Sequence, residues 1–235
     1  MPWVPELFSA PVLARFEAKQ RRKVVDIPYF DGLLAGETDA LIESFAGEPK
    51  LHHPLRGHIE GEYEFREFVA DTDRWLREHD ASVEDVQRSV LPARGFEEVI
   101  VHLDNPGGRI DLPHAMVADH TPDGLIEELR VYFDTRPLTG HATERAPLLP
   151  PDPELRNAPL VEEYAEERAA GGVDVEPCVL IEDGDTSALE YNARRGADDP
   201  SPQAGLTVLI RDAAGKLAAT RTYQGLALPA AGLDD

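Results

Sequence analysis

Two residues have side chains suited to moving a proton or holding a developing negative charge. His53 is one, because an imidazole titrates near neutrality and can exchange a proton with an apolar substrate. Tyr29 is the other, because a phenol can donate a hydrogen bond to a carbonyl or enolate oxygen. Both have structural alternatives, His53 as a rim residue of a His52-His53-Pro54 turn and Tyr29 as a packing residue of a helix. The sequence leaves these alternatives open.

Three further side chains, Glu98, His102 and Asp111, are candidates for assisting His53 in proton transfer. Glu98 and His102 are four positions apart, so on one strand they point the same way but lie about 13 Å apart. Each could instead reach His53 or Asp111 across a sheet, where a buried carboxylate commonly orients a histidine base. The alternatives are that Glu98 is a solvated charge at a strand end and that Asp111 lies at the pocket mouth.

Metal and phosphate sites are not indicated. The histidines at 52, 53 and 58 match no established ligand spacing, and the single Cys178 cannot form a cysteine-rich site. The Gly107-Gly108 pair lacks the strand–loop–helix context of a phosphate site. We therefore expect no metal and no cofactor.

Composition limits the class of partner. The chain of 235 residues has 45 acidic and 23 basic side chains, a formal charge of -22, which disfavours nucleic acid and anionic membranes as partners. No apolar run approaches the about 20 residues of a membrane helix, and no signal-peptide pattern opens the chain. We expect a globular cytoplasmic protein.

Apolar periodicity and turn signals predict the elements that position the candidate residues. A helical arm is expected within 1–23, followed by a first unit over 24–140. Its expected helices lie at 29–35, 38–45 and 65–79, its hairpin at 51–60, and its strands at 82–91, 97–103, 109–119 and 125–133. The order is helix, helix, hairpin, helix and meander.

An internal repeat predicts a second, shortened unit. Tyr29, Gly36 and Asp39 recur as Tyr164, Gly171 and Asp174 with an offset of 164 − 29 = 135. Gly124, Ile126, Arg130 and Tyr132 recur as Gly215, Leu217, Arg221 and Tyr223 with an offset of 215 − 124 = 91. The second unit therefore lacks 135 − 91 = 44 residues, which correspond to the hairpin and the third helix of the first unit.

The second unit is expected over 160–235, after a proline-rich linker at 141–159. Its expected elements are a helix at 160–170, strands near 178–182 and 187–194, and a hairpin at 206–223. Such a unit keeps a helix and a sheet but lacks the helix that would close a cone.

Residues 24–138 resemble nuclear transport factor 2-like (SnoaL-like) proteins. The resemblance rests on the segments LLAGETDALIESFAGEPKLHHP and LPHAMVADHTPDGLIEELRVYFD and on the order of elements. It implies an α+β fold in which a curved antiparallel sheet wraps around helices and leaves a conical pocket for an apolar small molecule, followed here by a truncated second copy. The family includes isomerases, epoxide hydrolases, polyketide cyclases, dehydratases and binding proteins, so the fold does not select among them.

The resemblance also assigns positions. Tyr29 matches the oxyanion-donating tyrosine of ketosteroid isomerases, and His53 falls where those enzymes place their aspartate base. Ala115 falls at the position of their second oxyanion donor, so that role is vacant. The three catalytic positions of limonene epoxide hydrolases fall at Glu98, Ile100 and Val131, which lack the required side chains.

The same alignment, with strand alternation, predicts which side chains face the pocket. On the strands these are Glu98, Ile100, His102, Asp111, Pro113, Ala115, Val117, Leu129, Val131 and Phe133, and on the third helix Phe68 and Trp75. Arg130, Tyr132 and Asp134 are expected on the opposite face, where the recurring Arg-x-Tyr pair indicates a structural role.

Two functions follow. The first is a cofactor-independent SnoaL-like enzyme that uses His53, Tyr29 and one of Glu98, His102 or Asp111 for cyclisation, isomerisation or dehydration of an apolar substrate. The second is a binding or interaction protein that holds an apolar ligand unchanged. Family members often dimerise through the outer face of the sheet, so we expect either a homodimer or an intrachain pseudo-dimer with the shortened copy.

Overall fold

The structure is a computed structural model that describes residues 29–196 and 201–224. The arm expected at 1–23 lies outside the described residues. The first unit, residues 29–140, contains α2 (Tyr29–Ala35), α3 (Thr38–Glu43), β1 (Lys50–His53), β2 (Gly57–Glu60), α4 (Glu62–Glu78), β3 (Ser82–Val90), β4 (Arg94–Asn105), β5 (Gly108–His120), β6 (Ile126–Phe133) and α5 (Arg136–Thr139). The expected order of elements is the order observed.

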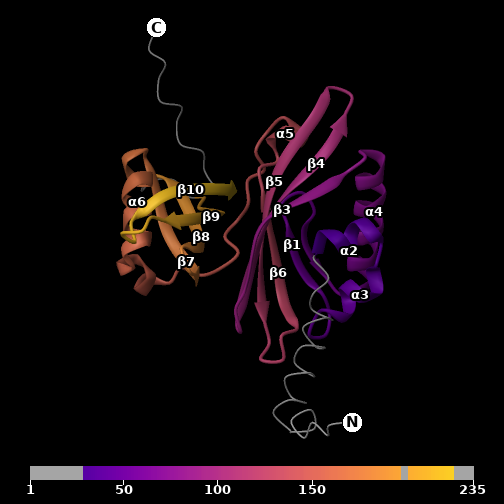
Figure 1. Cartoon of the computed structure of the whole chain (residues 1–235), viewed down its shortest axis with the longest axis horizontal. Helices are drawn as coiled ribbons and strands as arrows, with labels where there is room; N and C mark the ends of the chain where they lie inside the picture. Colours follow the sequence, from indigo (N-terminus) through magenta and orange to yellow (C-terminus); the bar gives the residue numbers. More distant parts are fainter. Residues whose placement is uncertain (1–28, 197–200, 225–235) are drawn as a thin grey trace, which may run out of the picture.

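The six strands of the first unit form one curved sheet in the order β2-β1-β6-β5-β4-β3 (Figure 1). All neighbouring strands are antiparallel except β1 and β6, which run parallel at Leu51 and His52. The expected sheet is therefore confirmed, with one parallel pairing that the sequence did not predict. This pairing brings the end of β1, and with it His53, beside the centre of the sheet.

Helices α2, α3 and α4 cover the concave face of this sheet (Figure 1). The apolar residues of α4 recur at helical spacing, and Phe65, Phe68, Val69 and Leu76 are buried against the sheet. Gly61 precedes the helix with a φ of 90°, a left-handed conformation in which glycine has no Cβ penalty. A tight turn therefore sends the chain from the hairpin directly into α4.

The second unit, residues 159–224, is smaller. It contains α6 (Pro159–Ala170), β7 (Val173–Asp183), β8 (Thr186–Arg195), β9 (Gln203–Arg211) and β10 (Leu217–Gln224), and its four strands form an antiparallel meander. Strand β7 directly follows α6, with no hairpin or helix between them. Leu160, Val161 and Tyr164 of α6 pack on the outer face of this sheet. The truncated second copy expected from the repeat is confirmed.

The two sheets pack against each other between the helical layers (Figure 1). The connecting segment, residues 141–158, contains a short 3-10 helix, η2 (Pro153–Asn157), and is otherwise irregular. Its Arg145 is buried over the Tyr132 ring and donates to the Val131 carbonyl at 2.7 Å. Among the helices of the described residues, none is both long and apolar enough to cross a membrane.

The interface between the sheets contains two matching sets of hydrogen bonds. Arg130 donates to both carboxylate oxygens of Glu190, at 2.7 and 3.0 Å, and Tyr132 donates to the same carboxylate at 2.6 Å. In the other direction, Arg221 donates to both oxygens of Glu98, at 2.8 and 2.5 Å, and Tyr223 also donates to Glu98. Each unit thus supplies the Arg-x-Tyr pair for the glutamate of the other unit.

These two glutamates occupy equivalent positions. Glu98 pairs with Ala115 on the next strand and Glu190 pairs with Leu206, while Arg130 pairs with Val117 and Arg221 pairs with Val208. Buried apolar residues surround both sets of hydrogen bonds. They are Phe96, Ala115, Val117, Tyr132, Val179, Ile181, Ala188, Leu206, Val208 and Tyr223. The central strands of the first sheet are therefore buried on both faces.

Candidate active site

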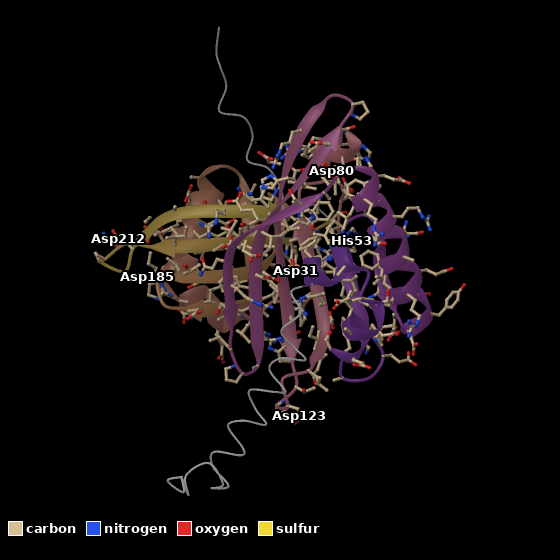
Figure 2. All side chains as sticks on the ribbon, turned by 45° about the vertical axis from the view of Figure 1, so that its right-hand side comes forward. Asp31, His53, Asp80, Asp123, Asp185 and Asp212 are labelled. Carbon is tan, nitrogen blue, oxygen red and sulfur yellow. The ribbon has the colours of Figure 1, made fainter. Side chains whose placement is uncertain are left out.

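A cavity of about 490 Å³ lies between the helices and the concave face of the six-stranded sheet. Its lining is mainly apolar, and Figure 2 shows His53 between these two layers. The apolar lining residues are Phe30, Leu33, Leu55, Phe68, Trp75, Leu76, Val101, Leu112, Val131, Phe133 and Leu138. Such a cavity suits an apolar small molecule, with orientation set by the few polar groups that line it.

His53 is the last residue of β1, and its ring packs against Phe68 and Phe133 with centroid distances of 5.3 and 5.4 Å. Its Nδ1 atom accepts hydrogen bonds from the backbone N–H groups of Leu55 at 3.2 Å and Arg56 at 3.3 Å. Since these partners can only donate, the neutral ring carries its proton on Nε2. His53 is therefore a hydrogen-bond donor toward the cavity.

Burial lowers the pKa of His53 to about 3, with smaller contributions from His114, Arg145 and Arg56. The ring is thus neutral at physiological pH. The expectation that His53 titrates near neutrality is wrong, because burial lowers its pKa. Its Nδ1 is occupied by the turn and its Nε2 bears the proton, so this arrangement favours His53 as a hydrogen-bond donor.

His114 was not among the candidates, but it lines the same cavity from β5. Its Nδ1 atom lies 2.9 Å from the carbonyl oxygen of Leu112, which can only accept, so Nδ1 carries the proton and Nε2 has a free lone pair. The ring packs on Phe133 at a centroid distance of 4.2 Å. Burial lowers the pKa of His114 to about 4, so this ring is also neutral at physiological pH.

The two histidines are complementary. Both contact Phe133, and their tautomers are opposite, so the Nε2 of His53 is a donor and the Nε2 of His114 an acceptor. Neither Nε2 atom has a hydrogen-bond partner within residues 29–196 and 201–224. A ligand in the cavity can therefore meet a neutral acid and a neutral base at once.

Tyr29 lines the cavity as expected, and its hydroxyl is buried with no hydrogen-bond partner in the described part of the chain. Burial raises the pKa of Tyr29 well above its ordinary value, so the phenol is neutral. Its ring also borders a second cavity of about 80 Å³, together with Ser89, whose hydroxyl also lacks a partner among the described residues. A buried hydroxyl without a partner carries a desolvation cost that a water or ligand would offset.

Charged side chains gather at the mouth of the large cavity. Arg56, in the turn after His53, donates to Asp71 of α4 at 2.6 Å, and Arg74 lies 3.4 Å from the other oxygen of Asp71. Arg56 and Asp71 are each about half exposed, with side-chain exposures of 48% and 47%. This ion pair joins the turn to the helix across the cavity.

Several of the residues predicted to face the pocket line the cavity. Val131 and Phe133 on β6, and Phe68 and Trp75 on α4, line the cavity. Leu129 faces the same core but borders only the smaller cavity. Arg130 and Tyr132 lie on the opposite face, as expected from the alignment.

On β4 and β5 the predicted face is wrong by one residue. The side chains that face the helices are those of Val99, Val101, Leu103, Leu112, His114 and Met116. The residues predicted for that face, which are Glu98, Ile100, His102, Asp111, Pro113, Ala115 and Val117, lie on the other side of the sheet. Three of the five catalytic candidates, Glu98, His102 and Asp111, are therefore outside the cavity.

The error has a physical cause. The face assignment rests on the family alignment, and an alignment displaced by one residue on β4 and β5 turns every side chain of those strands to the other face of the sheet. Glu98 is fully buried, but among residues of the second unit, where it accepts from Arg221 and Tyr223. Recurrence of glutamate at 190, 92 positions after Glu98, is the sequence signal that identifies this pairing.

His102 and Asp111 do meet, as a pair on the outer face. His102 Nδ1 lies 2.6 Å from Asp111, and its Nε2 lies 3.3 Å from Glu84 of β3. The hydrogen bond with His102 lowers the pKa of the Asp111 carboxyl. Among the residues that the structure describes, no group of His, Cys, Asp and Glu side chains has the geometry of a metal site.

Comparison with known proteins gives fold likeness only. No family model matches the chain, and no curated protein matches it. Among solved structures, SalBIII, an epoxide hydrolase/cyclase-like enzyme in pyran ring formation of salinomycin, is 22% identical. The match covers 48% of this chain and 89% of that chain, with a TM-score of 0.38.

Two others cover a similar share. A candidate SnoaL-like polyketide cyclase from Jannaschia sp. CCS1 is 15% identical over 48% of this chain and 85% of its own, with a TM-score of 0.39. A nuclear transport factor 2-like protein of unknown function from Cytophaga hutchinsonii is 18% identical over 50% of this chain and 93% of its own, with a TM-score of 0.37. About half of this chain is thus similar to SnoaL-like and nuclear transport factor 2-like proteins, and its function has to be argued from its own residues.

Proposed function

We propose that the first unit is a SnoaL-like enzyme that acts on an apolar carbonyl compound by proton transfer, without a cofactor. The observation that carries the proposal is the pair of neutral histidines, His53 and His114, with opposite tautomers in one apolar cavity. A donor and an acceptor placed together can stabilise an enolate and accept the proton whose removal forms it. His53 therefore takes the role of electrophile, and His114 the role of base.

In this mechanism, Nε2 of His114 removes a proton from the carbon next to the carbonyl group. The electron pair of that C–H bond moves toward the carbonyl oxygen, which accepts a hydrogen bond from Nε2–H of His53. The His114 imidazolium then returns its proton to another carbon of the conjugated system, which gives an isomer. If the His114 imidazolium instead gives its proton to a β-hydroxyl group, that group leaves the enolate as water and dehydration results. If the enolate carbon attacks a second carbonyl carbon, the oxygen of that carbonyl takes the proton from His114 and a cyclised alcohol results.

Neutrality of both rings supports this division of roles. A neutral imidazole can donate a hydrogen bond from its N–H group to an enolate oxygen, and burial of both rings keeps them neutral.

Binding of an apolar ligand without conversion is the second candidate function. The observation in its favour is the low pKa of His114, about 4, because a weaker base removes a carbon-bound proton more slowly.

Deuterium exchange distinguishes the two functions. The native protein would be incubated in D₂O with a panel of apolar β,γ-unsaturated and cyclic ketones, and exchange at the α-carbon followed by NMR. We expect His114→Gln to reduce the exchange rate about 10²-fold or more and His53→Gln to reduce it by a similar factor. His102→Gln is the matched control, because His102 lies outside the cavity. Saturable binding without exchange for every probe would favour the binding function.

A further inference from the structure

The turn between β1 and β2 determines which nitrogen of His53 bears the proton. Residues 54–56 form this turn, and the N–H groups of Leu55 and Arg56 both point at Nδ1 of His53. If the turn moved away by a few tenths of an ångström, these bonds of 3.2 and 3.3 Å would lengthen beyond hydrogen-bonding distance. The His53 ring could then adopt the alternative tautomer, in which Nδ1 carries the proton and Nε2 does not.

The turn is held from the opposite side of the cavity mouth. The Arg56 guanidinium donates to Asp71 at 2.6 Å, and Asp71 belongs to α4, which is packed on the sheet through its buried apolar face. Within the turn Pro54 is buried, whereas Leu55 is 41% exposed, so the Leu55–Arg56 end of the turn depends most on the Arg56 ion pair. A half-exposed ion pair adds little to global stability, so the expected effect of this pair is on the position of the turn.

We propose that Arg56 and Asp71 are positioning residues, which hold the 54–56 turn so that His53 stays in the Nε2–H tautomer. This inference rests on the proposed function, in which that tautomer supplies the hydrogen bond to the enolate. Neither residue touches the reacting atoms. The same ion pair also spans the mouth of the cavity, so ligand entry and the tautomer of His53 depend on one contact.

The test is Asp71→Ala in the full chain, with Asp73→Ala as the matched control. Asp73 lies on the same helix and forms a comparable ion pair with Arg77 at 2.8 Å, but it does not line the cavity. Long-range ¹H–¹⁵N correlation spectra report which histidine nitrogen is protonated. We expect Asp71→Ala to show a second set of His53 signals with Nδ1–H, Asp73→Ala to match the native chain, and Asp71→Glu to restore the native signals.

The exchange assay provides the second readout. Asp71→Ala is expected to lower kcat about tenfold with less than a twofold change in KM, since the loss is in orientation rather than in binding area. Native His53 signals in Asp71→Ala would overturn the positioning role whatever the activity. Absence of exchange in the native chain would instead refute the proposed function, and the spectra would still decide the positioning role.

The two matching sets of hydrogen bonds between the sheets support a second inference, about the role of the second unit. The outer face of the first sheet holds an Arg130-Tyr132 pair and Glu98, so it has both halves of the contact it makes with the second unit. Such a surface is self-complementary about a two-fold axis. We infer that the second unit is a built-in partner, which occupies the place where a second copy of the first unit would otherwise bind.

Charge reversal in the full chain tests this inference by light scattering. Glu190→Arg repels Arg130 but leaves Glu98, Arg130 and Tyr132 of the first unit intact, so two chains can pair through their first sheets and the mass should double from 25.9 kDa. Glu98→Arg is the control, because it removes the acid that such a dimer needs, and it should stay monomeric. The milder Glu190→Gln and Glu98→Gln would be compared in the same way if the reversed variants fail to fold. Equal masses within either pair of variants would overturn the inference.

Discussion

Equivalent positions beneath the first helix are filled by an aromatic ring in the second unit and border a cavity in the first unit. In the second unit, Tyr164 donates to Tyr191 at 3.2 Å, and the Tyr191 ring lies over Gly205. The equivalent positions in the first unit are Tyr29, Val99 and His114, where Val99 and His114 pair across β4 and β5 as Tyr191 and Gly205 do across β8 and β9. In the second unit the Tyr191 ring fills the space above Gly205, whereas in the first unit His114 lines the cavity.

This difference shows why only the first unit is a candidate active site. The hairpin and α4 of the first unit add a second wall, so the helices and sheet enclose a cavity. The second unit lacks that wall, and α6 packs directly on its sheet. All eight histidines of the chain also precede residue 142, so the second unit contains none. The second unit supplies buried surface and ion pairs, but no proton-transfer group of this kind.

The largest expected effect distinguishes the buried from the exposed partner of one ion pair between the two units. Glu98 has no exposed side-chain surface, whereas Arg221 is 37% exposed. Arg221→Ala leaves a buried carboxylate without its cation and should lower the free energy of unfolding by about 3–5 kcal/mol. Glu98→Ala should cost roughly half as much, because Arg221 can turn toward water. Urea denaturation measures both, and equal losses would show that burial does not control the cost.

The second effect is a pH dependence of the free energy of unfolding that arises from the two cavity histidines of the first unit. His53 and His114 have an ordinary pKa of 6.5 when unfolded and about 3 and 4 when folded, so the unfolded state binds more protons below pH 6.5. Stability is therefore full above pH 6.5 and falls as the pH decreases toward 4, by about 2 to 3 kcal/mol per pH unit for two groups. Urea titrations at pH 7, 6 and 5 measure this slope. His114→Asn should roughly halve it, and an unchanged slope would contradict the neutral buried state.

The interior of the second unit can be tested at Gly205. A Cβ there would lie 2.6 Å from two ring atoms of Tyr191 and 2.9 Å from the Gln224 carbonyl oxygen, so the sheet or the ring must shift. Gly205→Ala should destabilise the protein by about 1–3 kcal/mol. Thermal unfolding of Gly205→Ala and of the double variant Gly205→Ala/Tyr191→Leu measures how much of the loss comes from steric overlap between the new Cβ and the Tyr191 ring. If removing the ring recovers none of the loss, the ring is not the cause.

The smallest effect compares the two helix tyrosines. Tyr164→Phe leaves the Tyr191 hydroxyl without its hydrogen bond and should cost about 1 kcal/mol. Tyr29→Phe removes a hydroxyl that has no partner among the described residues, so stability should be unchanged or slightly increased. Denaturant midpoints of the two variants, compared with that of the native chain, measure both changes in stability. A substantial loss for Tyr29→Phe would mean that a water or another group binds this hydroxyl.

Much of this organisation was predictable from local patterns. The turn signals and apolar periodicity place the strands of the first unit within a few residues of their observed ends, and the two repeat offsets predict the missing hairpin and helix of the second unit. The alignment with strand alternation places Arg130 and Tyr132 on the correct face of β6, and their recurrence indicates a structural role. These features depend on spacing along the chain, which a sequence records directly.

The site was only half predictable, for a tertiary reason. His53 and Tyr29 were identified by type and position, but His114 was missed because the faces of β4 and β5 were assigned one residue out of register. That assignment rests on the family alignment, and a displacement of one residue exchanges the inward and outward side chains of a strand. The tautomers depend on the Leu112 carbonyl and the 54–56 turn, which are contacts of the folded chain.

The most direct test of the proton-transfer account is a long-range ¹H–¹⁵N correlation spectrum of the native chain at pH 7. We expect two neutral histidines with opposite tautomers, His53 protonated at Nε2 and His114 protonated at Nδ1. The same tautomer at both residues, or a charged ring at either one, would contradict it. In that case the cavity would lack the paired donor and acceptor on which the proposed enzyme depends.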